Sequence, residues 1–352
     1  MSLLISSELR RSAGVIERID PAQIRAAADA IKKAVSGGGQ VVFMGNGGSS
    51  ADAQHIAAEF SGKYAFDRPP MAGVSLSNIA PVTAIGNDYS YDLVFKRQVE
   101  ALCRKGDAVV GFSTSGNSRN VLLALEAAKA IGAFAISFTG DCGRIREVAD
   151  LPVIIPSTET PRIQEGYLAA CHAVCGIVER ELFGRKAVLI DRDGTLMRDV
   201  PHSADPDRVE LLPGAAEAVA RLNAAGYLVI VVTNQAGIAM GNYGEAELAE
   251  VHRVLREKIA AGGGRIDDIF FCPHDAPERR RDGGRCECRK PGIGMGEAAI
   301  MKHNIDPSRS FMVGDSEEMD MRFGEALGMR SILVSPERTL ADAADEILAA
   351  AR

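Results

Sequence analysis

Short apolar runs, each followed by a longer amphipathic stretch, recur along the whole chain of 352 residues. These runs are residues 40–45, 108–115, 133–140 and 151–156 in the first half, and residues 186–191, 227–234, 310–315 and 331–335 in the second half. Short apolar strands that alternate with helices pack as parallel sheets covered by helices on both faces. The pattern therefore predicts an α/β protein built from doubly wound parallel sheets.

Chain length and the pattern near residue 184 predict two domains. A prior of about 150 residues per domain gives two, each large enough to bury its own core. An amphipathic helical stretch ends near Gly184, and an apolar run starts at Ala187. We therefore expect one domain over residues 1–184 and a second over residues 185–352, which share architecture without an internal sequence repeat.

The composition is that of an ordered protein without a membrane span. Apolar residues make up 46% and charged residues 25% of the chain, and no apolar run approaches the roughly 20 residues that a span needs. Residues 1–184 carry 18 Lys and Arg against 19 Asp and Glu, and residues 185–352 carry 22 against 28. This balance argues against a nucleic-acid partner. The basic run at residues 278–285 is interrupted by acids and glycines, so we expect a solvated loop there. No signal peptide is visible in the sequence, so we expect a cytoplasmic protein.

Two aspartates, Asp191 and Asp193, end the apolar run at residues 186–191. Side chains two apart on a strand point to the same face, so a nucleophile and a proton donor can lie together at the strand's carboxyl end. Gly194 allows a sharp turn whose backbone amides can hold a phosphate. Because paired buried carboxylates are costly, a divalent cation is implied, with Asp315 as a further ligand.

Four motifs in the second half are arranged in an order that resembles the haloacid dehalogenase (HAD) superfamily. They are "DRDGT" from residue 191, "VVTN" from residue 231, "CRKP" from residue 288 and "VGDS" from residue 313. The resemblance implies a Rossmann-like domain in which Asp191 attacks phosphorus to form an aspartyl phosphate, and Asp193 protonates the leaving alcohol and then activates water. It also implies roles for two sets of side chains, with Thr233, Asn234, Arg289 and Lys290 binding substrate and Asp191, Asp193 and Asp315 holding Mg²⁺.

The fourth motif departs from this superfamily at one position. A second acid usually follows the first by four residues, but position 319 is Met. The neighbouring acids are Glu318 and Asp320. The sequence leaves these two as alternative supports for the metal.

Three of the seven cysteines lie close together with a histidine between residues 272 and 288. Cys272 with His274, and Cys286 with Cys288, form two pairs that can each bind one ion, giving a closed structural Zn²⁺ site. Chance clustering or a disulfide is the alternative. Because Cys288 directly precedes Arg289, the zinc site should fix the loop that presents cations to the substrate.

The zinc loop, with "TNQAGIAMG" and "LLPGAAEAVARLNAAGY", resembles D-glycero-D-manno-heptose 1,7-bisphosphate 7-phosphatases. The related histidinol-phosphate phosphatases share the zinc loop, so histidinol phosphate or another monoester is an alternative substrate. Met240 stands where the heptose enzymes usually carry Arg.

Two glycine- and serine-rich turns in the first half follow apolar runs and precede helical stretches. They are "NGGSS" from residue 46 and "STSGNS" from residue 113. Backbone amides, hydroxyls and the positive end of a helix can hold a phosphate without basic side chains. A dinucleotide fingerprint would need Gly where Ser50 stands, so the turns favour binding of a phosphate group over NAD.

Four polar residues in the first half are spaced to share helix faces. His55 and Glu59 are four residues apart, and Gln164 and His172 are eight apart, which is about one face after two turns. Each of them taken singly is more often structural. Together with two anion-binding turns they indicate a catalytic site.

These patterns, with "H-x-x-x-E", "GND" and "RIQE", resemble the sugar isomerase (SIS) domain and, within it, sedoheptulose-7-phosphate isomerases, over residues 1–183. The resemblance implies a flavodoxin-like fold and a homo-tetramer. It implies that Glu59 and His172 move a proton between C1 and C2 through an enediol. The other implied roles are phosphate binding by Ser113, Thr114, Ser115 and Ser118, sugar contacts from Asn46, Ser49 and Asp88, and substrate or Zn²⁺ binding by His55, Glu59, Gln164 and His172.

The two resemblances together predict a bifunctional enzyme of heptose biosynthesis. The first domain would convert sedoheptulose 7-phosphate to D-glycero-D-manno-heptose 7-phosphate, a separate kinase partner would phosphorylate C1, and the second domain would remove the 7-phosphate. The alternative is a first domain that senses a sugar phosphate without converting it. A sensor needs the serine turns but not the acid and base, so the presence of Glu59 and His172 favours catalysis.

Overall fold

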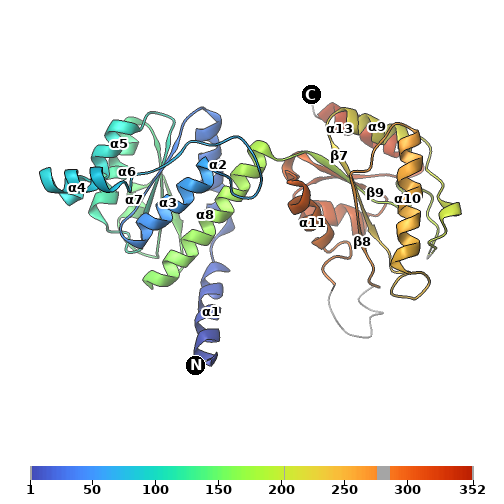
Figure 1. Ribbon diagram of the computed structural model, residues 1–352, viewed down its shortest axis with the longest axis horizontal. Coiled ribbons are helices and arrows are strands. Elements are labelled where there is room, and N and C mark those ends of the chain that lie inside the picture. Colours follow the sequence, from blue (N-terminus) through green and yellow to red (C-terminus); the bar gives the residue numbers. More distant parts are fainter. Residues whose placement is uncertain (1, 202, 276–285, 351–352) are drawn as a thin grey trace. The chain divides into compact units, whose positions relative to one another are not determined.

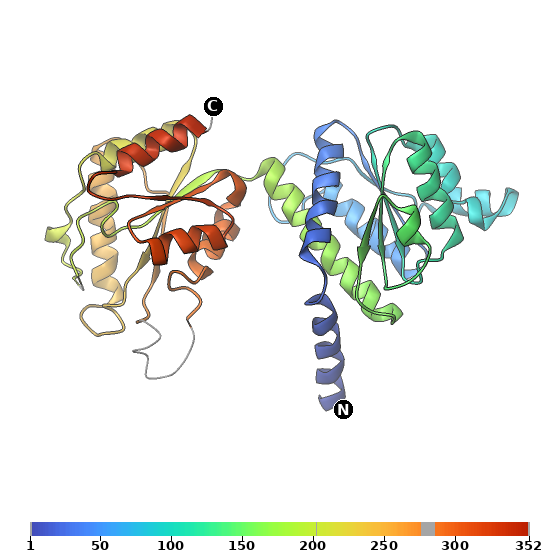
Figure 2. The ribbon, with the colours of Figure 1, turned by 180° about the vertical axis from the view of Figure 1, so that it is seen from behind.

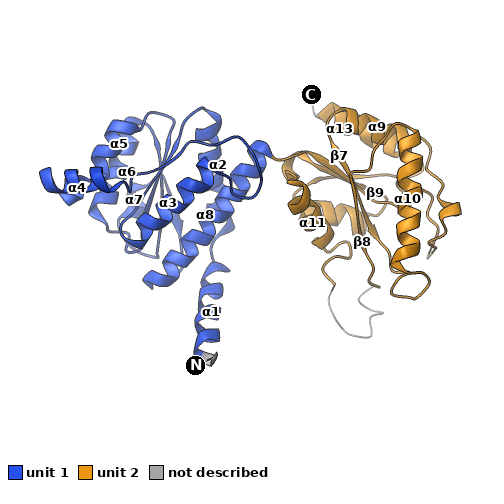
Figure 3. Ribbon diagram, in the orientation of Figure 1, with its two compact units in different colours: residues 1–183 blue, residues 184–352 orange. Residues whose placement is uncertain are grey.

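The computed structural model describes residues 2–201, 203–275 and 286–350. The chain divides into two compact units, Met1–Phe183 and Gly184–Arg352 (Figure 3). This division falls one residue before the boundary expected from the sequence. The basic run at residues 278–285, expected to form a solvated loop, lies outside the described residues.

The first unit is a five-stranded parallel sheet between two layers of helices (Figure 1). Its strands are β1 (Val41–Met44), β2 (Gly73–Ser75), β3 (Ala108–Ser113), β4 (Phe134–Thr139) and β5 (Leu151–Ile154), in the order β2-β1-β3-β4-β5. Its helices are α1 (Ser2–Ile16), α2 (Pro21–Ser36), α3 (Gly48–Ser61), α4 (Ile79–Asp88), η1 (Tyr91–Leu93), α5 (Lys96–Leu102), α6 (Arg119–Ile131), α7 (Ile145–Val148) and α8 (Thr160–Phe183).

Alternation along the strands divides the core of this unit between the two faces of the sheet. Val41 and Phe43 pack with residues of α2, α3 and α8, whereas Val42 and Met44 pack with residues of α5 and α6. All four side chains are buried, as expected when helices cover both faces of a parallel sheet.

The second unit repeats this architecture with a different strand order. Its strands are β6 (Ala187–Ile190), β7 (Leu228–Asn234), β8 (Asp268–Cys272), β9 (Phe311–Gly314) and β10 (Arg330–Leu333), in the order β10-β9-β6-β7-β8. Its helices are η2 (Pro206–Arg208), α9 (Ala215–Ala224), α10 (Glu245–Ala261), α11 (Gly294–His303), η4 (Pro307–Arg309), η5 (Glu317–Met321), α12 (Arg322–Ala326) and α13 (Leu340–Ala350). One core contains residues of α9, α10 and α13, and the other contains residues of α11 and α12. Figure 2 shows the helices on the two faces of this sheet from behind.

The prediction of two doubly wound parallel sheets is confirmed. Two edge strands, β2 and β8, were not predicted. β2 has only three residues, all partly buried, and β8 opens with the charged Asp268 and is mostly half-buried. The other two edge strands, β5 and β10, were predicted from the runs at residues 151–156 and 331–335. The short length of β2 and the charged start of β8, rather than edge position alone, therefore explain the two misses.

The strand order places a crevice at the carboxyl edge of each sheet. In the first unit the direction of winding reverses between β1 and β3, and in the second it reverses between β6 and β9. Loops diverge at such a point, and ligands of open α/β sheets bind there. Among the described residues, no helix has the length and apolar character to cross a membrane.

Candidate active sites

The serine-rich turn of the first unit links β3 to α6 at this crevice. The Ser113 and Ser118 hydroxyl oxygens are 2.9 Å apart, and Ser115 is exposed. Gly116 has φ 65°, and a Cβ there would lie 2.4 Å from the Cys142 carbonyl oxygen. The tight turn therefore needs glycine, and it leaves its amides and hydroxyls, with the half-buried Thr114, available to an anion.

The turn after β1 brings other predicted sugar-contacting residues to the same crevice. The Asn46 side chain exchanges hydrogen bonds with Asn120 over 2.9 and 2.8 Å. Ser49 lies buried with its hydroxyl 2.5 Å from the Tyr167 hydroxyl. Asp88 ends α4 as an exposed residue and accepts a hydrogen bond from the adjacent Asn87. Asn46 thus belongs to the turn after β1 and Ser49 to the first turn of α3, whereas Asp88 lies on a separate exposed helix.

Two helices of the first unit bring an acid and two imidazoles together. The Nε2 atoms of His55 and His172 are 3.0 Å apart, and His55 Nε2 lies 3.3 Å from a Glu59 carboxylate oxygen. Burial, followed by the nearby His55, lowers the pKa of His172. One ligand atom from each of these residues lies within 4.8 Å of the others. A neutral imidazole is the form that binds a metal, so the group fits Zn²⁺.

Gln164 also connects α3 and α8, but through another residue. Its amide Nε2 donates to an Asp52 carboxylate oxygen over 3.2 Å. A Cβ on Gly48 would lie 2.2 Å from the same nitrogen. Gln164 therefore packs directly against the start of α3, close to the β1 turn.

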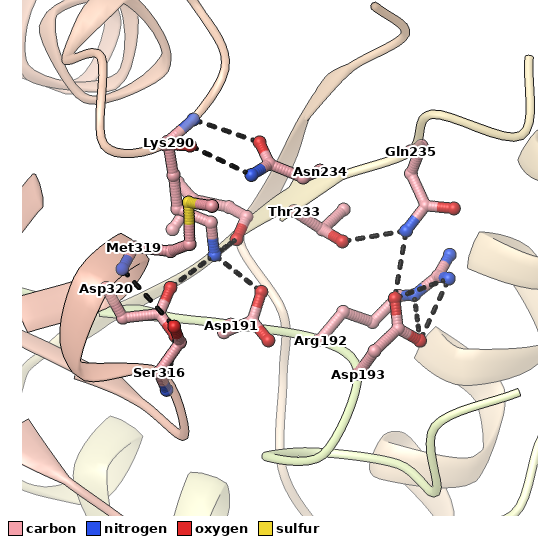
Figure 4. Close-up of polar contacts among 11 residues, drawn as sticks. Asp191, Arg192, Asp193, Thr233, Asn234, Gln235, Lys290, Ser316, Met319 and Asp320 are labelled. Atoms are coloured by element: carbon pink, nitrogen blue, oxygen red, sulfur yellow. Dashed lines mark hydrogen bonds and ion pairs between the residues drawn. The ribbon is translucent and has the colours of Figure 1, made fainter. Parts of the chain in front are cut away.

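A buried lysine joins two carboxylates in the second unit (Figure 4). Lys290 Nζ donates to Asp191 over 2.5 Å, to Asp320 over 2.6 Å and to the Val232 carbonyl over 2.8 Å. Burial raises the pKa of Asp191 to about 7, although Lys290 acts in the opposite direction. Burial acts to lower the pKa of Lys290, but the two carboxylates outweigh it and raise that pKa.

Asp315 completes this carboxylate group at the end of β9. Oxygen atoms of Asp191, Asp315 and Asp320 lie within 4.8 Å of one another. Three acids around one lysine leave excess negative charge, which is the environment that a divalent cation with oxygen ligands fits. A Cβ on Gly194, which has φ 75°, would lie 2.1 Å from Asp315, so this glycine is required for the close approach of the two loops.

A single π-helical turn, η5 (Glu317–Met321), places Asp320 rather than Glu318 beside Asp191 and Asp315. The Met321 amide donates to the Ser316 carbonyl, five residues earlier, over 3.2 Å. Asp320 is buried and its second carboxylate oxygen accepts from the Ser316 amide over 3.1 Å, while Glu318 is exposed. A π-helical turn contains one residue more than an α-helical turn. Asp320, the fifth residue after Asp315, therefore takes the position that the fourth residue after Asp315 would take in an α-helical turn.

Asp193 projects toward a different set of partners (Figure 4). Its carboxylate accepts from Arg192 over 2.9 Å and from Gln235 Nε2 over 2.9 Å. Tyr243 donates to Gln235 over 2.7 Å. None of these three residues was predicted as a site residue, although Arg192 lies in "DRDGT" and Gln235 lies in "TNQAGIAMG". The structure places the Asp193 carboxylate in this network rather than in the carboxylate group that fits a metal.

The remaining predicted substrate-binding residues border the same edge. Asn234 exchanges two hydrogen bonds with the Lys290 backbone, over 3.2 and 3.0 Å, and the Thr233 hydroxyl accepts from Gln235 over 2.8 Å. Arg289 donates to the His274 carbonyl over 3.2 Å. A pocket of about 330 Å³ is lined by Arg192, Asp193, Asn234, Gln235, Tyr243, Arg289 and neighbouring residues.

The cysteine and histidine pairs converge beside this pocket. The three Sγ atoms of Cys272, Cys286 and Cys288 are 3.1 to 3.5 Å apart, and His274 Nδ1 lies 3.1 to 3.5 Å from each. The three cysteines are free thiols rather than a disulfide. Four donors at these separations fit a tetrahedral Zn²⁺ site without an open position.

Comparisons with known proteins agree with both halves. A family model described as SIS domain matches residues 7–140, and one described as HAD-hydrolase-like matches residues 287–351. The phosphoheptose isomerase of Burkholderia pseudomallei is 50% identical over 167 residues, which are 47% of this chain and 85% of that protein. This chain belongs to the phosphoheptose isomerase family.

Each of two solved structures resembles one unit of this chain. The phosphoheptose isomerase of Neisseria gonorrhoeae is 37% identical, covering 51% of this chain and 98% of that one, with a TM-score of 0.48. The D,D-heptose 1,7-bisphosphate phosphatase of B. bronchiseptica, solved with magnesium and phosphate, is 33% identical, covering 47% of this chain and 99% of that one, with a TM-score of 0.41. The family resemblances predicted from the two sets of motifs are confirmed.

Proposed function

We propose that this chain is a bifunctional enzyme of heptose biosynthesis. Its first unit isomerises sedoheptulose 7-phosphate to D-glycero-D-manno-heptose 7-phosphate, and its second hydrolyses the 7-phosphate of D-glycero-D-manno-heptose 1,7-bisphosphate. The observation that carries this proposal is the presence, in one member of the phosphoheptose isomerase family, of two separate groups of side chains that could each hold a metal ion. The Asp191 group lies at the carboxyl ends of β6 and β9, and the His55, Glu59 and His172 group lies between α3 and α8.

In the proposed isomerisation, the serine-rich turn holds the phosphate and α3 and α8 supply the acid and base. Glu59 and His172 remove a proton from C1 of the ketose and return one to C2, so that the carbonyl moves to C1 through an enediol. Zn²⁺ held by His55, Glu59 and His172, with Gln164 close by, would polarise the sugar carbonyl. Neutral hydroxyl and amide donors suit a phosphate that must be bound but must not react.

In the proposed hydrolysis, the Asp191 carboxylate attacks phosphorus and the bond from phosphorus to the sugar oxygen breaks. Asp193 protonates that oxygen and then accepts a proton from the water that hydrolyses the aspartyl phosphate. Lys290 orients Asp191 through their 2.5 Å contact, while Thr233 and Asn234 hold phosphoryl oxygens. Mg²⁺ held by the carboxylate group would offset charge on the phosphoryl oxygens.

We assign the Cys272 to Cys288 zinc site a structural role in substrate recognition. His274, one of its ligands, accepts a hydrogen bond from Arg289 through its carbonyl. Arg289 also lines the pocket next to Asp193. A fixed guanidinium at this position would bind the second phosphate of a bisphosphate substrate, because guanidinium groups match phosphate oxygens in pairs.

The two proposed reactions are not consecutive, so a kinase that phosphorylates C1 must act between them. We also propose a homo-tetramer through the first unit, in the cytoplasm. Three apolar side chains of α1, Leu4, Ile5 and Leu9, are 57 to 68% exposed in the single chain, which supports burial of this helix in an assembly.

Phosphorus NMR of the purified protein with sedoheptulose 7-phosphate, Zn²⁺ and Mg²⁺ tests the first activity. A new phosphomonoester signal without free phosphate is expected, and an unchanged spectrum would contradict the isomerase assignment. A panel that includes the heptose bisphosphate and histidinol phosphate tests the second activity. Faster phosphate release from the bisphosphate is expected, whereas preference for histidinol phosphate would reassign the substrate.

A further inference from the structure

A buried ion pair joins two segments of the first unit near its histidine and glutamate group. The side chains of Arg68 and Glu179 are only 1% and 0% exposed, and Arg68 Nε lies 2.9 Å from Glu179 Oε1. The Glu179 carboxylate also accepts from the Tyr64 amide over 2.9 Å and from the Ala65 amide over 2.7 Å. Every oxygen of this carboxylate therefore has a partner within the fold.

The other end of the Arg68 guanidinium is bound to the last turn of α3. Arg68 Nη1 donates to the Phe60 carbonyl over 2.8 Å, and Nη2 donates to the Glu59 carbonyl over 2.7 Å. Carbonyls at a helix carboxyl end lack partners within the helix and attract a cation. One guanidinium thus ties the end of α3 to a carboxylate on α8.

The two tied helices carry the residues assigned to proton transfer. Glu59 contributes its carbonyl to Arg68 and its carboxylate to the group with His55. Glu179 follows His172 by seven residues, two turns along the same face of α8. The Tyr64 ring, in the irregular segment between α3 and Arg68, lies 5.5 Å from the His172 ring.

We propose that the Arg68 and Glu179 pair is a positioning device that sets the separation of Glu59 and His172. The proposal rests on the proposed isomerase function. A buried ion pair contributes little net stability compared with well-packed apolar residues, so stability alone does not account for it. The hydrogen bonds of the pair are directional, so they fix the position of α3 along α8. Apolar packing alone would define this position less specifically.

The test compares Glu179→Gln with Glu181→Gln, a matched variant two residues along α8. Glu181 pairs with Arg25 and Lys32, which lie on α2 rather than α3. We expect Glu179→Gln to lower isomerase kcat about 10- to 100-fold, with KM changed less than about threefold because the serine-rich turn stays intact. Glu181→Gln should keep the wild-type values, and both variants should keep phosphatase activity.

A Co²⁺ titration supplies a readout that does not depend on isomerase activity. Thiolate charge-transfer absorption marks the cysteine site, and excess Mg²⁺ occupies the carboxylate group of the second unit, so the remaining absorption reports binding by His55, Glu59 and His172. Glu179→Gln should weaken this binding by about tenfold or more. If its melting temperature falls while kcat and Co²⁺ affinity stay at wild-type values, the pair is merely structural and the proposal is overturned.

A second variant covers the case in which Glu179→Gln does not fold. Arg68→Lys keeps the positive charge but cannot bridge the carboxylate and two carbonyls at once, so it should show the same pattern of lowered kcat and Co²⁺ affinity. Wild-type values for Arg68→Lys would overturn the proposal. If the wild type fails to isomerise the ketose, the proposed function fails, and the Co²⁺ comparison still decides the positioning role.

Discussion

The two units have similar sheets, but the sites that we propose for phosphate differ in their electrostatics. The first offers hydroxyls and amides in the turn from Ser113 to Ser118, which contains no charged residue. The second surrounds buried Lys290 with the carboxylates of Asp191 and Asp320. An isomerase needs to anchor the phosphate, whereas a phosphatase needs to attack it, and attack requires a nucleophile together with the charges that balance it.

This difference predicts unequal sensitivity to substitution. Loss of one neutral hydrogen bond costs about 0.5–1.5 kcal/mol. Removal of one member of a buried charged pair costs about 3–5 kcal/mol, because the remaining charge is left uncompensated. Changes in the second unit should therefore affect both activity and folding more strongly than changes in the serine-rich turn.

The largest effect is expected for Asp191→Asn. The amide is nearly the same size as the carboxylate but is a far weaker nucleophile, so phosphate release from the bisphosphate should fall about 10⁴-fold or more. Isomerisation should stay unchanged, since the substitution lies in the other unit. Residual phosphatase activity within tenfold of wild type would show that Asp191 is not the nucleophile.

Glu59→Gln should have the next largest effect, and in the opposite unit. Removal of a general base lowers the rate about 10²- to 10⁴-fold, so the isomerisation kcat should fall by this amount. Phosphatase activity measured on the same preparation serves as the control for folding. Equal isomerisation rates for the variant and wild type would exclude Glu59 from proton transfer.

Cys286→Ser should reduce phosphatase turnover about 10- to 100-fold, because the loss of zinc releases the loop that carries Arg289. Metal analysis and phosphate release are measured together. Cys142→Ser, which changes an exposed free cysteine of the first unit, should leave both values at wild type. A Cys286→Ser protein with full turnover and no zinc at this site would contradict the role of the loop.

The smallest effect concerns the acid stability of the second unit. Burial lowers the pKa of His252 to about 3, and its ring accepts from Arg192 over 3.3 Å. In the unfolded state the His252 ring binds a proton near pH 6.5, whereas in the folded state it stays neutral at that pH. The free energy of unfolding should therefore fall as pH drops below about 6.5, by about 1.4 kcal/mol per pH unit.

Urea unfolding at pH 6.5, 5.5 and 4.5 checks this slope, with His252→Gln as the comparison. The glutamine carries no titrating group, so the slope in this pH range should become shallower. Identical slopes for the two proteins would show that His252 does not control acid sensitivity.

The sequence was most informative where one local pattern encodes one feature. Central strands and the Cys272 to Cys288 pairs could be predicted because apolar runs and ligand spacing are local. Asp320 could not be selected over Glu318, because its orientation depends on a π-helical turn. The contact of Arg68 with Glu179 joins residues far apart in sequence, and neither lies in a recognised motif, so only the packing of α3 on α8 reveals it.

The central claim, that one chain carries two independent catalytic sites, is tested most directly by a crossed phosphorus NMR experiment. Glu59→Gln and Asp191→Asn are each incubated with sedoheptulose 7-phosphate and, separately, with D-glycero-D-manno-heptose 1,7-bisphosphate. The account predicts that Glu59→Gln releases phosphate from the bisphosphate but leaves the ketose unchanged, and that Asp191→Asn does the reverse. Loss of both reactions in either folded variant would contradict the claim.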